Sequence, residues 1–284
     1  MTTFDPATST IQHSAALARR PSFGDALRSE WIKLLSLPSA VLALIGIFAV
    51  GLGGSLFLGA TLESSGVPSV PSLERTIGDV TIPMVVLGQI IAGILGVMSV
   101  GAEYSSGSIQ TTLMAAPTRL RVLWAKASVQ FIAVTATALV TVFGAWAATY
   151  PFYVKHGLEA PLNGQGVLVA LLGAAAYLGM CAVVGVGIGM LVRSTTVGAI
   201  LIFAATLLGP ILASALPYSL LSRVARVTLL GNAGDTMARV ETPGGPFLDI
   251  WNGHISTAAG WLIVSIWVVL ALAAGAIALQ NRDA

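Results

Sequence analysis

Six long stretches without a single Asp, Glu, Lys or Arg dominate this sequence. They are residues 34–62, 80–102, 127–154, 160–192, 194–222 and 250–281. A helix needs about 20 apolar residues to cross roughly 30 Å of hydrocarbon, so each stretch has room for one crossing and hardly for two. Charged residues make up only 9% of the chain, whereas a soluble domain carries about 25%. The sequence therefore predicts an all-α membrane protein with six transmembrane helices.

The charged intervals divide the chain into parts. Residues 1–20 are polar and without pattern, as is typical of a disordered tail. A transmembrane domain is expected over residues 37–284, with a loop of residues 102–125 after the second span and a long loop of residues 217–256 after the fifth. The spans themselves are expected at about 38–61, 81–101, 126–149, 167–191, 196–216 and 257–279.

Residues 21–36 predict an amphipathic helix before the first span. Ser22 and Asp25 have the spacing of a capping box. Apolar residues then recur at helical spacing, and polar residues occupy the other side: Phe23, Leu27, Trp31 and Leu34 against Arg28, Ser29 and Lys33. We expect this helix to lie in the membrane interface. The alternative is that it only extends the first span.

The distribution of basic residues predicts the orientation. With the N-terminus inside, nine basic residues fall on the cytoplasmic side: Arg19, Arg20, Arg28, Lys33, Arg119, Arg121, Lys126, Arg193 and Arg282. Five fall outside: Arg75, Lys155, Arg223, Arg226 and Arg239. Because cytoplasmic loops carry the excess of Lys and Arg, both termini are expected in the cytoplasm.

Glycine and polar residues within the spans suggest how the helices pack. Gly185, Gly187 and Gly189 in the fourth span favour close helix packing over a nucleotide loop. Gln89 in the second span needs an interhelical partner, or else lines a substrate route. Pro210 should kink the fifth span and free the carbonyl of Thr206, which makes either a simple bend or a polar spot facing a cavity.

Two loops carry helical patterns. In the loop 217–256 an apolar stripe lies opposite two arginines, which favours a helix dipping into the outer leaflet over an ordinary surface loop: Leu220, Val224, Val227 and Leu230 against Arg223 and Arg226. In the loop 102–125, Gly107 and Ser108 can start a short helix that ends at Pro117. The cations that follow it, Arg119, Arg121 and Lys126, are also explained as plain topology anchors.

Several kinds of chemistry have no motif in this chain. Lys33, Lys126 and Lys155 follow Ile, Ala and Val, so no Gly-Lys pair of a phosphate loop exists and ATP binding is not expected. No predicted span holds an acid or a histidine at depth for a proton relay, and His13, His156 and His254 lack metal-ligand spacing. The net charge of +2 does not favour nucleic acid. We therefore expect neither an enzyme, nor a metal site, nor a bound cofactor.

The loop 102–125 resembles the first cytoplasmic loop of type-2 ABC exporter permeases, the transmembrane subunits of bacterial ABC transporters. The resemblance rests on Gly101-Ala102-Glu103-Tyr104-Ser105-Ser106-Gly107-Ser108, on Thr111-Thr112-Leu113, and on Arg119 through Val122 with Lys126. It extends to residues 29–34, to Gly231-Asn232-Ala233-Gly234 and to residues 281–284. The chain departs from many relatives at Leu229-Leu230, where they have a proline and a serine.

The resemblance implies a multi-pass subunit of the bacterial plasma (inner) membrane that exports an amphipathic drug, peptide or lipid-like substrate. Two copies of a cytoplasmic ATPase subunit would supply ATP and Mg²⁺, and a second permease copy, as a homodimer, would complete the route; membrane lipids surround it. Contact with the ATPase is implied for Glu103, Gly107, Ser108, Ile109, Thr112, Leu113, Arg119 and Arg121. The substrate route is implied near Gln89, Phe203, Thr206 and Pro210.

Two points stay open at this stage. Glu103 is expected either to orient the loop through a charge-assisted hydrogen bond or only to balance Arg121. The rival function is a non-transporting membrane scaffold or assembly subunit, and a membrane enzyme comes third.

Overall fold

The computed structural model describes residues 22–67, 71–107, 119–217, 219–241 and 244–281. This part of the chain is mostly helical, with one short antiparallel strand pair. The first half contains α2 (Phe23–Ser36), α3 (Pro38–Ala60), α4 (Leu62–Ser65), α5 (Leu73–Pro83), the π-helical segment η1 (Met84–Gly88), α6 (Gln89–Ser105) and α8 (Arg119–Val154). The second half contains α9 (Val167–Val192), α10 (Thr195–Phe203), the π-helical segment η2 (Ala204–Leu208), α11 (Gly209–Ala215), α12 (Leu220–Thr228), α13 (Leu230–Met237), β1 (Leu248–Asp249), β2 (His254–Ile255) and α14 (Thr257–Asn281).

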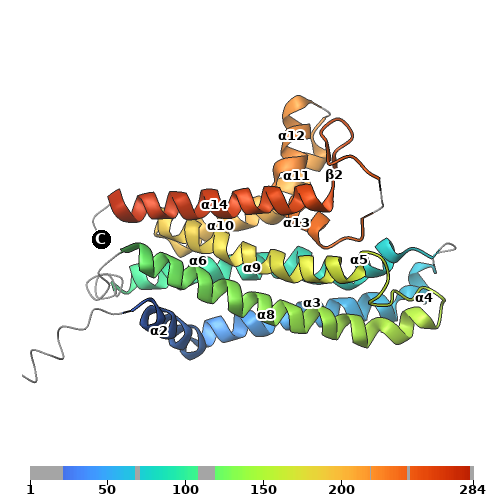
Figure 1. The fold of residues 1–284 in the computed structure, drawn as a ribbon, viewed down its shortest axis with the longest axis horizontal. Coiled ribbons are helices and arrows are strands. Elements are labelled where there is room, and N and C mark those ends of the chain that lie inside the picture. Colours follow the sequence, from blue (N-terminus) through green and yellow to red (C-terminus); the bar gives the residue numbers. More distant parts are fainter. Residues whose placement is uncertain (1–21, 68–70, 108–118, 218, 242–243, 282–284) are drawn as a thin grey trace, which may run out of the picture.

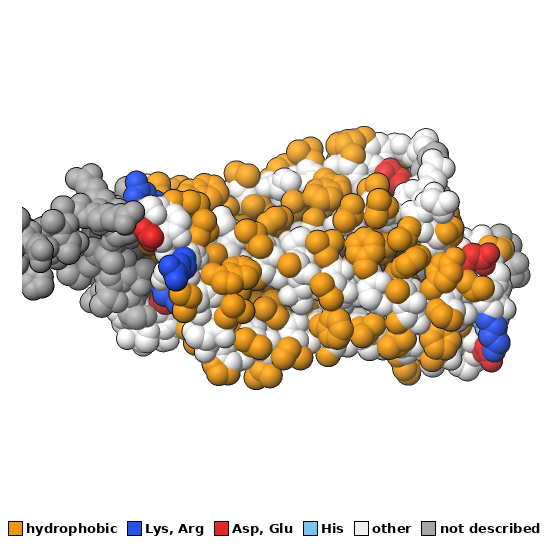
Figure 2. All heavy atoms as spheres, turned by 60° about the horizontal axis from the view of Figure 1, so that its bottom comes forward, with side chains coloured by type: hydrophobic (Ala, Val, Ile, Leu, Met, Phe, Trp, Pro, Cys, Tyr) orange, Lys and Arg blue, Asp and Glu red, His pale blue; other side chains and the backbone are white. Residues whose placement is uncertain are grey.

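Six helices are long and apolar enough to cross a membrane, which confirms the prediction of six spans. They are α3, the continuous α5–η1–α6, α8, α9, α10–η2–α11 and α14. The second helix begins at Leu73 rather than near 81, and the third runs from Arg119 to Val154 rather than over 126–149. Figure 2 shows a broad band of hydrophobic side chains between two charged ends. These features support a multi-pass membrane protein.

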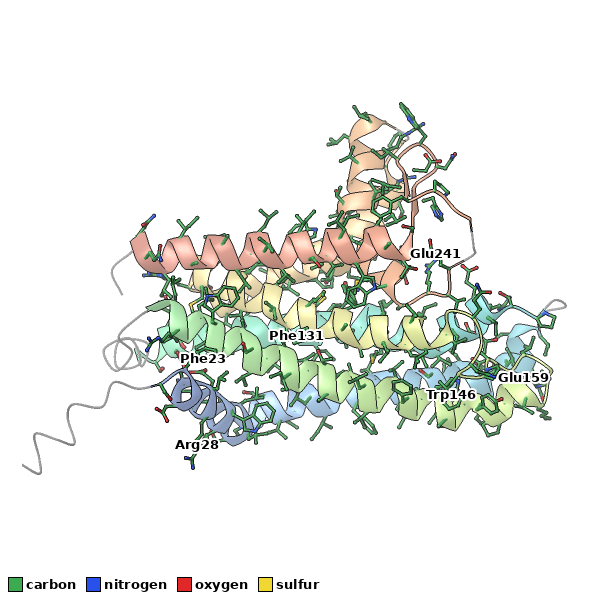
Figure 3. The ribbon with its side chains drawn as sticks, viewed as in Figure 1. Phe23, Arg28, Phe131, Trp146, Glu159 and Glu241 are labelled. Carbon is green, nitrogen blue, oxygen red and sulfur yellow. The ribbon has the colours of Figure 1, made fainter. Side chains whose placement is uncertain are left out.

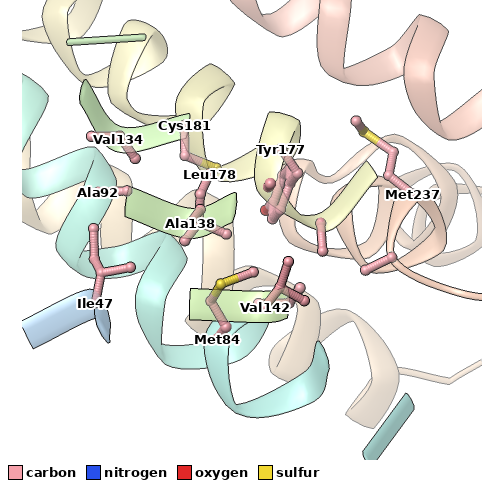
Figure 4. Close-up of a cluster of buried hydrophobic side chains, with 14 of the residues drawn as sticks. Ile47, Met84, Ala92, Val134, Ala138, Val142, Tyr177, Leu178, Cys181 and Met237 are labelled. Atoms are coloured by element: carbon pink, nitrogen blue, oxygen red, sulfur yellow. The ribbon is translucent and has the colours of Figure 1, made fainter. Parts of the chain in front are cut away.

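Helix α9 lies at the centre of the bundle and packs against α6, α8 and α14. Its side chains Tyr177, Leu178 and Cys181 are fully buried. Figure 4 shows them among side chains of the surrounding elements: Ile47 of α3, Met84 of η1, Ala92 of α6, and Val134, Ala138 and Val142 of α8. The fourth span is therefore enclosed by protein.

Glycines allow α6 and α9 to approach at backbone distance. A Cβ added at Gly96 would overlap the carbonyl oxygen of Ala182, and one added at Gly185 would overlap the carbonyl oxygen of Gly93. Small residues let apolar helices pack this closely. The sequence-based prediction of tight packing for the fourth span is confirmed.

The two ends of the bundle differ. At one end, which we call the α2 end, α2 lies beside the start of α8, and the last turn of α14 is at the same end (Figure 1). The turn that joins α9 to α10 is short, and Ser194 caps α10 by accepting a hydrogen bond from the Val197 amide at 3.4 Å. Helices α9 and α10 pack together as antiparallel neighbours, as predicted.

The opposite end, which we call the α12 end, carries the elements of the long loop. Helices α11 and α12 project from the bundle there (Figure 1). The helix expected near Leu220 exists as α12, but its apolar stripe is not as expected. Leu220 and Val224 are exposed, whereas Val227 is buried and Leu230 starts the separate helix α13.

The close approach of α6 and α9 gives a direct prediction. Gly96→Ala should destabilise the purified protein by roughly 1–3 kcal/mol, because the added methyl group meets a backbone carbonyl that cannot rotate away. Gly53→Ala is the matched control, since nothing lies within 4 Å of the position of its added Cβ. Thermal unfolding in detergent measures both, and an equal loss in the two variants would contradict the packing argument.

Candidate functional site

Helix α2 is a separate element docked on the bundle. Its capping box is formed: the Asp25 amide donates to Ser22 Oγ at 3.2 Å, and the Ser22 amide donates to Asp25 Oδ2 at 2.9 Å. The last residue of α2 is Ser36. Leu37, which follows it, has an extended backbone, so α2 does not simply extend the first span. Arg28 points away from the bundle (Figure 3), whereas Glu30 and Leu34 are buried against it.

A cluster of four charged side chains, three of them buried, joins α2 to the bundle; we call it the ion quartet. It consists of Glu30 and Lys33 of α2, Glu103 of α6 and Lys126 of α8. Lys33 Nζ lies 2.8 Å from Glu30 Oε1 and 2.7 Å from Glu103 Oε1. Lys126 Nζ lies 2.6 Å from Glu30 Oε2 and 2.7 Å from Glu103 Oε1.

The two lysines differ in their surroundings. The Lys126 side chain is only 1% exposed, and its third donor bonds the carbonyl of Ser99 at 3.1 Å, so all three donors of the ammonium group have acceptors. The Lys33 side chain is 36% exposed. Burial acts to lower the pKa of Lys33, but hydrogen bonds and charge from Glu103 and Glu30 outweigh it and raise that pKa above its ordinary value. Lys33 therefore stays charged up to alkaline pH.

The two oxygens of Glu103 are used unequally. Both lysines of the quartet contact Oε1, while Oε2 is buried and has no hydrogen-bond partner in the described structure. Glu103 accepts charge-assisted hydrogen bonds from Lys33 and Lys126. Its expected part in orienting the loop through such a bond stays a prediction. Glu30 was not identified from the sequence, and Lys33 was expected on the polar side of the helix. Their spacing of three residues on one helix was the available signal.

The other residues for which contact with an ATPase is expected lie next to the quartet or outside the described residues. Gly107 follows the end of α6 with φ +71°, a conformation typical of the glycine that terminates a helix. Arg121 is exposed. The side chain of Arg119 and all of Ser108, Ile109, Thr112 and Leu113 lie outside the described residues, as does the predicted short helix ending at Pro117.

A second polar cluster joins spans two, four and five. Gln89 Nε2 donates to the carbonyl of Thr206 at 3.2 Å, and Gln89 Oε1 accepts a hydrogen bond from the Tyr177 hydroxyl. Pro210 has no N–H to offer the Thr206 carbonyl four residues earlier, so the glutamine amide supplies the missing donor. This confirms the interhelical partner expected for Gln89.

The remaining candidate route residues lie on or near η2. Gln89 and Thr206 are buried, and Phe203 is exposed on the side of α10. Pro210 borders a cavity of about 330 Å³ at the α12 end, with Arg223, Arg226 and Asp235 among its other lining residues. Within the described part of the chain, no three His, Cys, Asp or Glu residues lie close enough to hold a metal ion.

The quartet gives the second prediction. Lys126→Met should destabilise the protein by roughly 3–5 kcal/mol, because it leaves two buried carboxylates facing one lysine. Glu30→Gln combined with Lys126→Met should recover part of that loss, since the remaining charges balance. Lys155→Met is the control: its 2.7 Å pair with Glu63 is exposed, and little change is expected. Equal unfolding temperatures for Lys126→Met and Lys155→Met would contradict the account.

The Gln89 cluster gives the third prediction. Gln89→Leu should cost about 0.6–2 kcal/mol, a typical interhelical hydrogen bond within a membrane. In a Pro210→Ala background the cost should shrink, because residue 210 then has an N–H for the Thr206 carbonyl. A double-mutant cycle of thermal stabilities measures the difference. Identical costs in both backgrounds would show that this carbonyl is not what the amide stabilises.

No family model fits the chain, and no curated protein matches it. The likeness to type-2 exporter permeases therefore rests on the short motifs quoted above. The structure itself establishes a helical protein with six membrane-length helices and a buried ion quartet at the α2 end.

Proposed function

We propose that this chain is the permease subunit of an ATP-driven exporter, with the α2 end in the cytoplasm of a bacterial cell. The subunit would use the ATP and Mg²⁺ of two separate ATPase copies and would work as a homodimer in the plasma membrane. An amphipathic drug, peptide or lipid-like molecule is the substrate class. The chain has no phosphate loop of its own, so its energy must come from a partner.

The observation that carries this proposal is the position of the ion quartet around the loop 106–118. Glu103 lies near the end of α6, just before the loop, and Lys126 lies near the start of α8, just after it. Their 2.7 Å ion pair joins the two helices, and Glu30 and Lys33 add α2 to the same cluster. A displacement of the loop by a partner would thus reach three helices together.

A second contact supports the same role. The guanidinium of Arg193 lies 4.9 Å from the centre of the Tyr104 ring, which links the turn between α9 and α10 to the end of α6. From there α10 leads to η2, whose Thr206 is bonded to Gln89 of the second span. Spans two and five are therefore connected at the α2 end and again within the bundle. We propose that they move together when the route changes from inward-facing to outward-facing.

Site-specific photocrosslinking tests the function. A photoreactive residue at Ile109 should crosslink in native membranes to a protein that contains a phosphate loop, because the loop 106–118 is the proposed docking segment. The same residue at Leu221, which is 77% exposed at the α12 end, is the matched control and should not form that adduct. Mass spectrometry identifies the crosslinked peptide.

The outcomes separate the candidates. An ATPase adduct at Ile109 whose yield changes on addition of ATP supports an exporter subunit. Reproducible adducts only with proteins that have no nucleotide-binding motif favour the scaffold or assembly subunit. An ATPase adduct at Leu221 instead of Ile109 would show that the proposed orientation is inverted.

A further inference from the structure

The cavity of about 330 Å³ at the α12 end lies between α11, α12, α13 and the turn that joins β1 to β2. This volume lies in the range of ordinary small-molecule sites. Four charged side chains line it: Arg223 and Arg226 of α12, Asp235 of α13, and Arg239 just after α13. Three arginines against one aspartate leave a formal charge of +2 on the wall. The cavity therefore favours a negatively charged ligand.

Two of the three arginines are held in place by neutral groups. Arg226 donates hydrogen bonds to the carbonyls of Ala213 and Leu216 at 2.8 and 2.9 Å. The guanidinium of Arg223 lies 4.7 Å from the centre of the Trp251 ring. None of these three neighbours carries a full charge, so they orient the two cations without cancelling their charge. Both arginines are partly exposed.

Arg239 supplies the third cation. Its Nη2 donates to Asp235 Oδ2, in an ion pair between positions four residues apart. The Arg239 side chain is 50% exposed. A guanidinium has five N–H donors in a planar fork, so Arg239 can hold Asp235 and a second oxyanion at the same time.

Neighbouring carboxylates do not reverse the charge of this wall. Asp249 accepts hydrogen bonds at 2.9 and 3.2 Å from two backbone amides of its own turn, and another at 2.6 Å from the Asn252 side chain. Counting Asp249 with the wall would still leave a charge of +1. Arg239 also borders a second cavity of about 180 Å³, whose carboxylates, Glu74 and Glu241, do not line the larger one.

The number and charge of the guanidiniums select the kind of anion. A phosphate monoester carries a charge of about −1.5 to −2 at pH 7 and has three strong acceptor oxygens. It can therefore balance the charge of +2 on the wall and give each of the three arginines an oxygen. Arginine binds such groups through two parallel hydrogen bonds. A carboxylate has half that charge and two oxygens.

We propose that this cavity binds a phosphate monoester, either the head group of a membrane lipid or a soluble ester. The phosphate oxygens accept hydrogen bonds from Arg223 and Arg239, and Arg226 adds its charge from a fixed position. Helix α11 borders the cavity and also exposes Ile211 and Leu212, so acyl chains attached to the phosphate would have an apolar helix surface beside them. The inference does not rest on the proposed export role, because it needs neither an ATPase nor a particular orientation of the chain.

Native mass spectrometry of the purified full chain in an uncharged detergent tests the site. The probe is dioleoyl phosphatidic acid, and dioleoylglycerol is the comparison ligand because it has the same chains without the phosphate. Phosphatidic acid should bind at least about tenfold more tightly, which corresponds to roughly 1.4 kcal/mol. Equal binding of the two lipids would overturn the proposal.

Glycerol phosphate, which has the same phosphate monoester without chains, separates the two sources. If it binds as tightly as phosphatidic acid, the ligand is a soluble ester. If it binds more weakly, the ligand is a lipid. If neither phosphate compound binds, the proposal is wrong.

Four variants locate the binding, and Arg226 is left intact because it holds the bend between α11 and α12. Arg223→Gln and Arg239→Gln should each weaken phosphatidic acid binding about tenfold. Asp235→Asn should strengthen it, because the substitution removes the negative charge of the wall. Arg75→Gln is the matched control: Arg75 of α5 is exposed at the same end of the bundle (Figure 1) and does not line this cavity, so binding should not change. An equal loss in Arg75→Gln, or weaker binding by Asp235→Asn, would contradict the assignment.

Discussion

Charge that leaves water for an apolar interior costs several kcal/mol per ion unless other charges and hydrogen bonds replace the lost solvent. At the α2 end this constraint applies to three side chains at once, because Lys126 is almost completely buried and Glu30 and Glu103 nearly so. Each of these three has at least one oppositely charged partner within the quartet. At this end the ion pairs act together with apolar packing, since Leu34 of α2, Val100 of α6 and Leu123 of α8 are buried as well.

The two ends of the molecule differ in the contacts that join their elements. At the α2 end, helices remote in sequence are joined by short directional contacts, and the loop 106–118 begins and ends beside them. At the α12 end, α11 and α12 project from the bundle, and Arg226 bonds the carbonyls of Ala213 and Leu216 to hold the bend between them. The proposed docking side is thus joined by charged side chains, and the proposed exit side by hydrogen bonds to backbone carbonyls.

The sequence predicted what depends on local spacing. Charge-free stretches predicted the six spans, and three-residue spacing predicted the capping box of Ser22 and Asp25. The lack of an N–H at Pro210 exposed the Thr206 carbonyl, and the depth of Gln89 called for a partner. What the sequence left open depends on pairing over long distances. Lys126 meets Glu30 across 96 residues and Glu103 across 23, and no local pattern selects these pairs among the available charges.

Two further features were not predicted. The π-helical segments η1 and η2 interrupt the second and fifth spans, and the apolar spacing of these spans does not indicate such interruptions. The sequence analysis used residues 231–234 only as a motif and did not predict helix α13. This helix packs closely on its neighbours: a Cβ at Gly231 would overlap the Thr206 carbonyl, and one at Gly234 would overlap the ring of Tyr177.

The glycine contacts of α9 restrict how this protein can change shape. Gly185 and Gly187 seat backbone of α6 and α14 in notches that have no room for a side chain, so α9 cannot slide along either neighbour without steric collision. Spans four, two and six are therefore interlocked at these notches. The first and fifth spans have the smallest shares of buried residues among the six. A joint movement of spans two and five, as proposed, would therefore have to carry span four with it.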